Sequence, residues 1–438
     1  MKKRIVLGIL ILVIYSLVCV SCERPTTKST FVEAKNGLLY KEGKPYYYIG
    51  ANFWYGAILS STGQGGNRNR LNAELDSLFS LGIDNLRILV GADGKEYRKS
   101  KVYPVLQLEP GVYNDTILDG LDYLIDQMSK RQMKAVLFLN NSWEWTGGYG
   151  QYLEWAGYGR MPIPALDGWN NFRKYVSQFI TSASAQKLFD DHVKFILNRT
   201  NRYSGIRYVD DPTIMAWQIG NEPRAFSDEN KKQFADWLAH VSSLIKSIDK
   251  NHLLSVGSEG ERGCEDDLFL WKYIHEDKNI DYATFHIWPK NWKWIDTENI
   301  PETIEKAIDN TIDYISSHVE IAEQLKKPLV LEEFGFPRDS MGLSPQTSTN
   351  FRDIYYKYVC RQIVNASQEK LKLVGCNFWS WAGLGKAIHE EWKLGDDYLG
   401  DPAQEPQGLN SVFITDSTVN IIKVYQNILR TMNNNCKN

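Results

Sequence analysis

Short apolar runs alternate with longer amphipathic stretches along most of the chain. Apolar runs bounded by turn residues are typical of buried strands, whereas apolar residues spaced by three and four indicate helices. The pattern predicts strands at 46–52, 84–89, 135–139, 213–219, 253–256, 282–287, 328–331 and 373–379. It predicts helices at 71–81, 117–131, 186–203, 227–249, 301–325, 350–368 and 419–432. A small hairpin is expected before the first strand, at 31–44.

Strands that alternate with helices indicate an α/β fold, and eight such strands favour a (β/α)₈ TIM barrel. A doubly wound open sheet is the alternative, and it usually carries a Gly-rich phosphate-binding turn after its first strand. Here Asn52-Phe53-Trp54-Tyr55 follows the first strand instead. We therefore expect a single barrel domain over residues 31–438.

The connection after the third predicted strand, residues 140–185, is long and rich in aromatic residues. Long loops inside compact domains are usually functional or disordered. The aromatic content argues against disorder, because disordered segments contain few aromatic residues. We expect long aromatic loops at one end of the barrel.

Composition narrows the function classes. The 438 residues carry a net charge of −3, with no basic stripe that would favour nucleic acid as a partner. Aromatic residues make up 13%, including 14 Trp and 24 Tyr, whose flat faces and polar edges suit contact with sugar rings. The histidines show no HxH or HExxH spacing, so we expect no catalytic metal, and we expect no cofactor.

The N-terminus is typical of an export signal, predicted over residues 1–21. Lys2, Lys3 and Arg4 precede an apolar run at 5–20. Ser21-Cys22 resembles a bacterial lipoprotein cleavage box, although Cys19 stands where that box usually has Leu. Cys22 is thus a predicted lipidation site, with a tether at 22–30. The protein is expected to be exported, as a cell-surface or periplasmic lipoprotein, or otherwise secreted. The remaining cysteines are too few for a disulfide scaffold; they are Cys264, Cys360, Cys376 and Cys436.

Polar side chains gather at the ends of the predicted strands. In a barrel these ends meet at one mouth, where active sites lie. Glu222 and Glu333 follow two of the strands, and two carboxylates at one mouth are what a glycosidase needs. A nucleophilic Ser hydrolase would show GxSxG, which is absent. The other strand ends supply Arg87, Asn140, Asn141, Asn221, His286, Trp288, Trp379 and Trp381.

Asn221-Glu222-Pro223 and Glu333-Phe334-Gly335 resemble the catalytic motifs of glycoside hydrolase family five, in the clan of retaining barrel enzymes. Within that family the chain resembles the endo-β-1,4-mannanase branch, and the resemblance spans about residues 36–381. The other stretches that carry it are Trp54-Tyr55, Leu86-Arg87, Asn140-Asn141, 147–156, 217–224, 285–288 with Trp292, and Phe378-Trp379. One departure is Trp288, because family members commonly have Tyr there.

The resemblance implies that Glu333 is the nucleophile and Glu222 the acid/base, with carboxyl groups about 5–5.5 Å apart. Arg87 would keep Glu333 charged, His286 would orient Glu222 or the substrate, and Glu332 would point to the opposite side of its strand. Asn221 would hold the sugar 2-hydroxyl, and Trp379 would form a stacking floor. The full expected substrate-binding set is Trp54, Arg87, Asn140, Trp143, Asn221, His286, Trp288 and Trp379.

The predicted function is retaining endo-hydrolysis of β-1,4-mannosidic linkages in mannan, glucomannan or galactomannan. Alternatives within the family are a β-1,4-glucanase (cellulase) and an exo-β-mannosidase whose cleft is blocked by a loop, for which the long third loop is suitable. A catalytically inactive glycan-binding barrel is the alternative from another class. We expect a monomer that binds mannan-type saccharides and does not bind nucleic acid. Contact with a membrane is expected only through the lipid.

Overall fold

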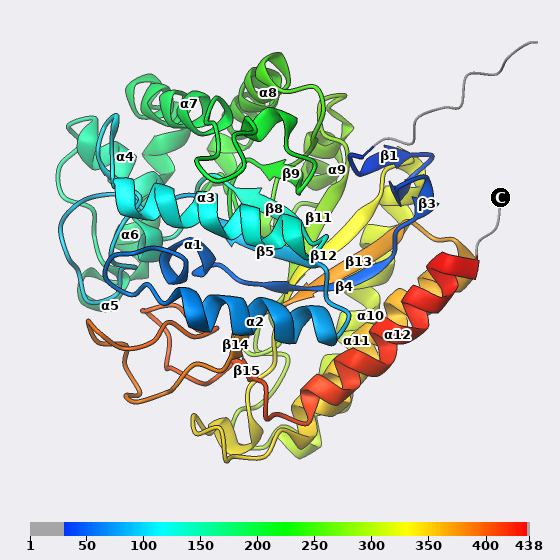
Figure 1. Ribbon diagram of the computed structural model, residues 1–438. Coiled ribbons are helices and arrows are strands. Elements are labelled where there is room, and N and C mark those ends of the chain that lie inside the picture. The colour runs from blue at the N-terminus through cyan, green and yellow to red at the C-terminus, as the bar shows by residue number, and fades with distance from the viewer. Residues whose placement is uncertain (1–29, 436–438) are drawn as a thin grey trace, which may run out of the picture.

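The structure is a computed structural model, and it describes residues 30–435 (Figure 1). The predicted signal peptide, most of the predicted tether with Cys22, and Cys436 lie outside the described residues. Within residues 30–435, no helix is long and apolar enough to cross a membrane. The cysteines in this range, Cys264, Cys360 and Cys376, are buried free thiols.

Eight parallel strands form the central sheet, in the order β10-β9-β8-β5-β4-β13-β12-β11. Between the two outer strands of this order, the Asp281 N–H donates to Leu254 O (2.8 Å) and the His286 N–H to Glu259 O (3.2 Å), which closes the ring. The predicted (β/α)₈ barrel is therefore confirmed. Its strands are β4 (Tyr48–Asn52), β5 (Asn85–Leu89), β8 (Lys134–Phe138), β9 (Ile214–Gln218), β10 (Leu253–Ser255), β11 (Ala283–Ile287), β12 (Leu329–Phe334) and β13 (Leu373–Phe378).

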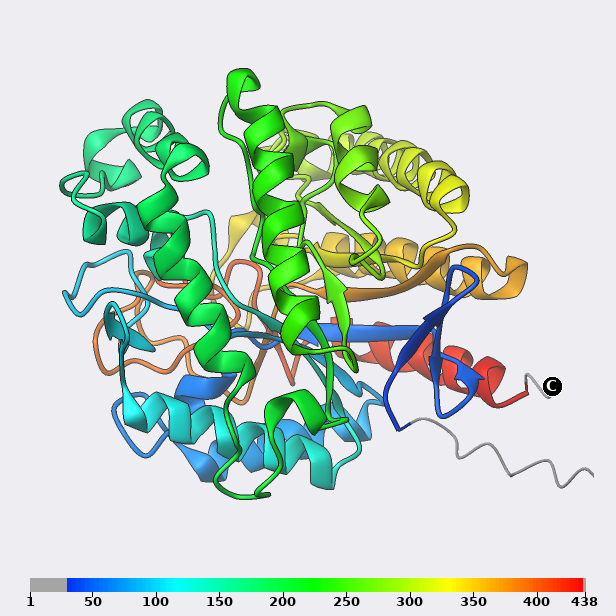
Figure 2. The same ribbon diagram turned by 90° about the horizontal axis from the view of Figure 1, so that it is seen from above.

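Helices cover the outside of the barrel (Figure 2). The local reason is clear in α3, where the Asn114 side chain caps the first turn and Ile117, Leu118, Leu121 and Ile125 are buried on one face. The helix α9 (Leu268–Glu276) was not predicted, and α8 (Lys231–Ile248) begins later than the predicted residue 227, after a 3₁₀ turn at Asp228–Asn230. The outer helices are α2 (Arg68–Ser80), α3 (Asp115–Lys130), α7 (Ala183–Leu197), α8 (Lys231–Ile248), α9 (Leu268–Glu276), α10 (Ile300–Leu325), α11 (Asn350–Glu369) and α12 (Thr418–Asn435).

The N-terminal sheet lies at the amino ends of the barrel strands, on the right in Figure 1, and the last helix runs along the outside of the barrel and ends there. β1 (Glu33–Lys35), β2 (Leu38–Lys41) and β3 (Lys44–Pro45) form that small antiparallel sheet. From α12, the Gln426 amide accepts a hydrogen bond from Ile49 N–H (2.8 Å) and donates one to Gly82 O (2.8 Å). The C-terminal helix thus holds the first barrel strand in place.

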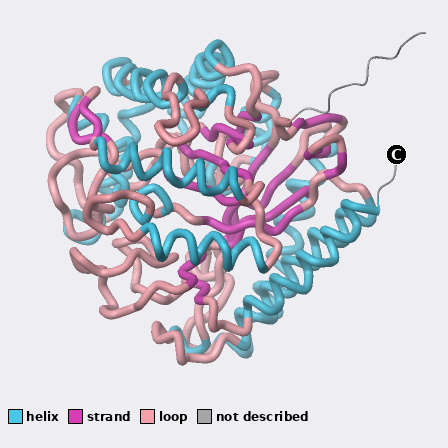
Figure 3. The backbone as a smooth tube through the Cα atoms, in the orientation of Figure 1, coloured by secondary structure: helices cyan, strands magenta, loops and turns pink. Residues whose placement is uncertain are grey.

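Two long segments lie at the opposite end of the barrel, on the left, where loops are concentrated (Figure 3). The first, predicted as a loop, contains short helices: α4 (Gly148–Trp155), α5 (Pro164–Asp167) and α6 (Trp169–Val176). The second, residues 384–411, connects β14 (Trp381–Gly383) with β15 (Val412–Phe413). The shorter elements at this end are α1 (Gly56–Leu59), β6 (Gln107–Glu109) and β7 (Val112–Tyr113).

Candidate active site

Glu222 lies just beyond β9, in the left-handed backbone region with a φ of 50°. Its N–H donates to Gly257 O (2.9 Å), which fixes the turn. One carboxylate oxygen accepts the indole N–H of Trp143 (2.5 Å), and the other lies 2.9 Å from His286 Nδ1. The side chain is almost buried, since Glu222 is 7% exposed.

Glu333 lies on β12, across the mouth from Glu222, and is 2% exposed. Arg87 donates to its Oε1 (2.5 Å), and His286 Nδ1 lies 3.5 Å from its Oε2. One oxygen of each glutamate and a ring nitrogen of His286 all lie within 4.8 Å of one another. Carboxylate oxygens this close favour the 5–5.5 Å carboxyl spacing of retaining glycosidases over the 6.5–9.5 Å spacing of inverting ones.

Arg87 on β5 connects the groups beneath the two glutamates. Besides Glu333, its guanidinium donates to Gln218 (2.7 Å), Asn52 (3.1 Å) and Asn221 (2.8 Å). Arg87 is fully buried, so these hydrogen bonds replace the water it has lost. The Asn221 amide in turn donates to Asn141 (3.2 Å). Arg87 thereby fixes both the proposed nucleophile and the asparagine beside Glu222.

The electrostatics of the pair favour one shared proton. Burial raises the pKa of Glu222, while Arg224 and the Trp143 N–H oppose the rise. Burial also raises the pKa of Glu333 well above its usual range, and Arg87 opposes this while the Glu222 charge adds to it. Two close carboxylates titrate as a unit. Because Arg87 contacts Glu333 directly, the negative charge belongs on Glu333 and the proton on Glu222.

His286 is neutral between the two carboxylates. Burial lowers the pKa of His286 well below its usual range, and the nearby Arg87 lowers it further. A neutral imidazole has one N–H. Placed on Nδ1, that proton serves the contact to Glu222, and the buried Nε2 has no hydrogen-bond partner among the described residues.

The prediction that Glu332 points away from Glu333 is wrong. The register between β11 and β12 shifts so that Phe285 pairs with Leu331 and His286 with Glu333, which leaves Glu332 unpaired in a bulge. Glu332 therefore also faces the barrel interior, where it accepts from Gln218 (2.5 Å) and Tyr282 (3.1 Å). Burial raises its pKa to about 7, although Arg87 opposes the rise.

The structure brings most of the other predicted site residues together. Trp288 packs edge-to-face with Trp379 (5.9 Å between ring centroids), and donation from Trp288 is among the causes that lower the pKa of Glu222. Asn140 accepts the Asn221 N–H through its carbonyl (2.8 Å). Within residues 30–435, buried donors of Asn140, Asn141 and Trp379 have no hydrogen-bond partner.

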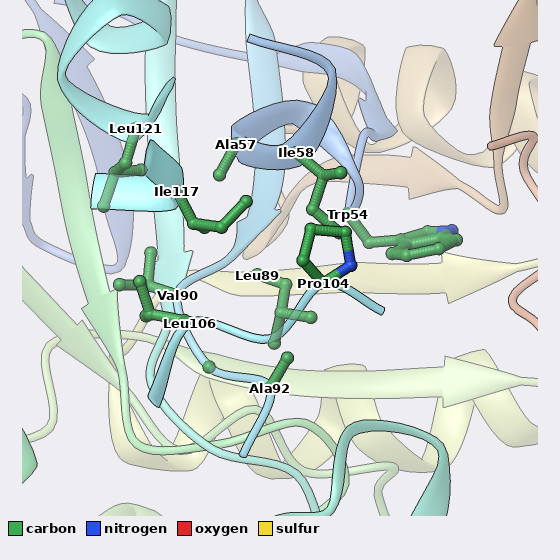
Figure 4. Close-up of a pocket in the computed structure, with 11 residues that line it drawn as sticks. Trp54, Ala57, Ile58, Leu89, Val90, Ala92, Pro104, Leu106, Ile117 and Leu121 are labelled. Atoms are coloured by element: carbon green, nitrogen blue, oxygen red, sulfur yellow. The ribbon is translucent and has the colours of Figure 1, made fainter. Parts of the chain in front are cut away.

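Trp54 and Trp381 are not brought to the mouth surface. Trp54 is 1% exposed, and its indole N–H donates to Gly400 O (2.8 Å). It borders a small apolar cavity of about 10 Å³, lined by side chains such as Ile58, Leu89 and Leu121, which is far too small for a sugar (Figure 4). The buried Trp381 donates to Glu74 (2.8 Å). Both tryptophans support the loops around the site.

Three charged residues at the mouth were missed. The half-buried Arg224 pairs with the buried Glu259 beside Glu222, and the Trp292 N–H donates to Glu259 (3.2 Å). Burial raises the pKa of Glu259, and Glu222 adds to the rise although Arg224 opposes it. Burial raises the pKa of Glu405 to about 8, with smaller contributions from Asp401 and Glu222. Glu259 follows the fifth strand, so the strand-end rule itself could have found it.

Glu222, His286 and Glu333 are also the one group of ligand-type side chains, within residues 30–435, close enough to hold a metal ion. The Arg87 guanidinium already contacts a Glu333 oxygen, and its positive charge would repel a cation there. The arrangement is better suited to proton transfer between a carboxylate pair and a bound molecule.

Buried paired glutamates at the carboxyl ends of two barrel strands define a glycoside hydrolase. Residues 29–434 match the model of a family described as "GH family 5 beta-mannosidase-like". The chain belongs to this family, which confirms the resemblance drawn from the motifs.

Named relatives and solved structures are similar over most of the chain. Mannan endo-1,4-beta-mannosidase 7 of Arabidopsis thaliana is 29% identical, covering 80% of this chain and 77% of its own. A family 5 mannosidase from Rhizomucor miehei has 34% identity and a TM-score of 0.86, covering 93% of this chain and 99% of its own. An endo-beta-1,4-mannanase from Thermotoga petrophila has 26% identity and a TM-score of 0.65, covering 89% and 78%.

Proposed function

We propose that the protein hydrolyses β-1,4-mannosidic bonds with retention of the anomeric configuration. The observation that carries this proposal is the close approach of the Glu222 and Glu333 carboxylates, within 4.8 Å. Such a separation leaves room for direct attack on a sugar but not for an intervening water. The mannoside specificity is supported by the names of the relatives and by a structure of the Rhizomucor miehei enzyme with mannosyl-fructose.

In the first step, the Glu333 carboxylate attacks the anomeric carbon while Glu222 protonates the departing glycosidic oxygen. Arg87 holds Glu333 in place and ionised. The products are a mannosyl ester on Glu333 and a free leaving-group sugar. As Glu222 loses its proton, the Trp143 N–H and His286 stabilise the new negative charge.

In the second step, Glu222 takes a proton from water, and the hydroxide oxygen attacks the same carbon from the face that the leaving group vacated. The ester bond breaks, Glu333 returns to its carboxylate form, and Glu222 is protonated again. The buried unpartnered donors of Asn140 and Trp379 are suited to the sugar hydroxyls, because buried polar groups are normally hydrogen-bonded.

We further propose that cleavage takes place at chain ends or in short oligosaccharides. A polysaccharide that crosses the site needs an opening on both sides of the carboxylates. Trp54 and Arg70 hold the 384–411 segment through hydrogen bonds to its carbonyls (2.8 and 3.0 Å), and its Glu405 lies within electrostatic range of Glu222, so this segment is the candidate barrier on one side. The chain is also more similar in structure to a protein named a mannosidase than to one named an endo-beta-1,4-mannanase, which agrees with this proposal.

Internal cleavage of mannan is the second candidate. It is favoured by the names of the curated relatives, which include mannan endo-1,4-beta-mannosidase 4 of Solanum lycopersicum, 30% identical over 296 residues. The retaining mechanism would be the same. Only the space beyond the two carboxylates distinguishes the two modes of action.

The products of mannopentaose reduced at one end test these proposals. End action releases mannose and shortened reduced oligomers from the first minutes, and leaves the viscosity of a mannan solution almost constant. Early release of internal fragments with falling viscosity would instead establish internal cleavage. NMR should detect the β-anomer of the product first, and an α-anomer would refute retention. Cellopentaose cleavage without mannopentaose cleavage would refute the mannoside specificity.

We also propose export with a lipid on Cys22, a residue outside the described range. Cells grown with an alkyne fatty acid should give a labelled protein in the membrane fraction, and the Cys22→Ala variant should carry no label. Label on that variant, or none on the wild type, would contradict lipidation at this residue.

A further inference from the structure

Trp169 is a large exposed aromatic side chain that packs against Trp143, the residue that donates to Glu222. It is the first residue of α6 and is 53% exposed. An indole offers a broad apolar face, and leaving it in water has a free-energy cost that burial against a ligand would remove. Trp169 is therefore a candidate contact for a bound molecule.

Other aromatic rings hold Trp169 in a defined orientation. It meets Trp143 edge-to-face (5.9 Å, 85°) and Phe172 in the same manner (6.0 Å, 87°). Trp143 and Phe172 are stacked on each other (6.3 Å, 21°), so the three rings form one cluster. Edge-to-face packing on two sides restricts the rotation of the Trp169 ring.

The backbone before Trp169 is shaped by a glycine. Gly168 has φ 82° and ψ 150°, a conformation that residues with a Cβ rarely adopt. The Asn171 amide donates to Asp167 O (2.7 Å) across this turn. The turn ends α5 and starts α6 directly at Trp169, which places the indole next to Trp143.

The position of Trp143 shows which side of the bond Trp169 serves. Glu222 protonates the oxygen of the leaving group. One oxygen of Glu222 faces His286, which also approaches the nucleophile Glu333 (3.5 Å). Trp143 on the other oxygen is therefore directed away from Glu333 and toward the leaving group. Trp143 donates to the Glu222 carboxylate (2.5 Å), and Trp169 lies beyond Trp143 in the same cluster.

We propose that Trp169 is a stacking platform for a sugar on the leaving-group side, and this rests on the proposed function. A β-linked mannose ring carries axial C–H groups at C1, C3 and C5 on one face, while its axial 2-hydroxyl lies on the other. The face that carries the C–H groups is apolar and can stack on the flat face of an indole. The platform favours substrates whose leaving group is itself a sugar with such an apolar face, as a β-linked mannose has.

The test compares two substrates with the same mannosyl group but different leaving groups. Trp169→Ala should lower kcat/KM for mannotriose about 3- to 10-fold, as the loss of one aromatic contact implies. Hydrolysis of β-mannosyl fluoride should be unchanged, because fluoride is too small to reach Trp169. Trp169→Phe should retain most of the mannotriose activity. Tyr158→Ala is the matched control, since Tyr158 is a 43% exposed aromatic residue on the same insertion.

An equal loss of kcat/KM with both substrates, or no loss with either, would refute the proposal that Trp169 is a stacking platform. If the wild type cleaves neither substrate, the proposed function fails instead. Binding then tests the platform separately: calorimetric titration with mannotriose, in a Glu222→Gln background, should show affinity weakened 3- to 10-fold by Trp169→Ala, as estimated above. Equal affinities would refute the platform whatever the catalytic activity.

Discussion

Replacing Trp143 with Phe tests how the acid/base glutamate is tuned. The change keeps a similar ring in the aromatic cluster but removes the N–H that donates to Glu222 (2.5 Å). That N–H favours the ionised carboxylate and lowers the pKa of Glu222, so its removal should raise this pKa. The proton needed for the first step would then be retained to higher pH.

The magnitude follows from the strength of one hydrogen bond to a charged group. Such a bond contributes about 1.5–3 kcal/mol, and one pKa unit corresponds to about 1.4 kcal/mol. Because Glu222 keeps its contact with His286, we expect the low end, a shift of about one unit. The N–H also stabilises charge that develops as the proton leaves, so the plateau of kcat/KM should fall about 10-fold.

The assay is the pH dependence of kcat/KM for mannotriose, whose alkaline limb reports loss of the Glu222 proton in the free enzyme. Trp271→Phe is the control, because its buried N–H donates to Thr284 O (3.0 Å), away from the two glutamates. An alkaline limb that stays in place, or moves to lower pH, in a folded Trp143→Phe protein would refute this account of Glu222.

Three further predictions concern the nucleophile and the charged network. Glu333→Ala should lower kcat about 10⁴-fold or more, and added azide should restore turnover with an α-mannosyl azide product. Glu222→Ala with azide should instead give the β-mannosyl azide. If NMR finds the two products the other way round, the roles of the two glutamates are exchanged. Arg87→Met removes the group that lowers the pKa of Glu333, so the acid limb of kcat/KM should move to higher pH, and urea unfolding should show a loss of about 3–5 kcal/mol. Asp416→Asn removes the counter-charge of the buried Arg338 (2.7 Å) and should also cost about 3–5 kcal/mol, whereas unchanged stability would mean that this ion pair is dispensable.

The barrel could be predicted because its strands and helices are encoded locally. Each predicted strand overlaps an observed one, since a buried parallel strand needs only a short apolar run and a turn. The connection after β8 was predicted as a loop because its glycines and aromatic residues lack a helical period. Its helix α4 depends on distant packing, such as Tyr149 stacked on Phe179 (4.1 Å) and edge-to-face with Trp237 (5.6 Å).

The candidate site could be predicted only for residues whose position follows from their place at the end of a barrel strand. The strand-end rule placed Glu222, Glu333 and Arg87 together, and the structure brings Arg87 into contact with Glu333 and places Glu222 within 4.8 Å of Glu333. The expectation for Glu332 came from the alternation of side chains along a strand, and it failed because a bulge in β12 is a property of two paired strands and leaves no mark in one sequence. The strand-end rule failed for Trp54, which is covered by Gly400, a residue far along the chain.

The hydrogen bonds between α12 and the first barrel strand determine when the barrel can be completed during translation. The Ile49 N–H depends on Gln426, and the Asn433 amide donates to Tyr47 O (2.8 Å). A ribosome makes the first strand early and these partners almost last, so the nascent barrel cannot be completed until translation is nearly finished. A chain that ends before α12 would bury backbone N–H and C=O groups of the first strand without their hydrogen-bond partners. Such truncated chains should fold poorly and be degraded readily by proteases.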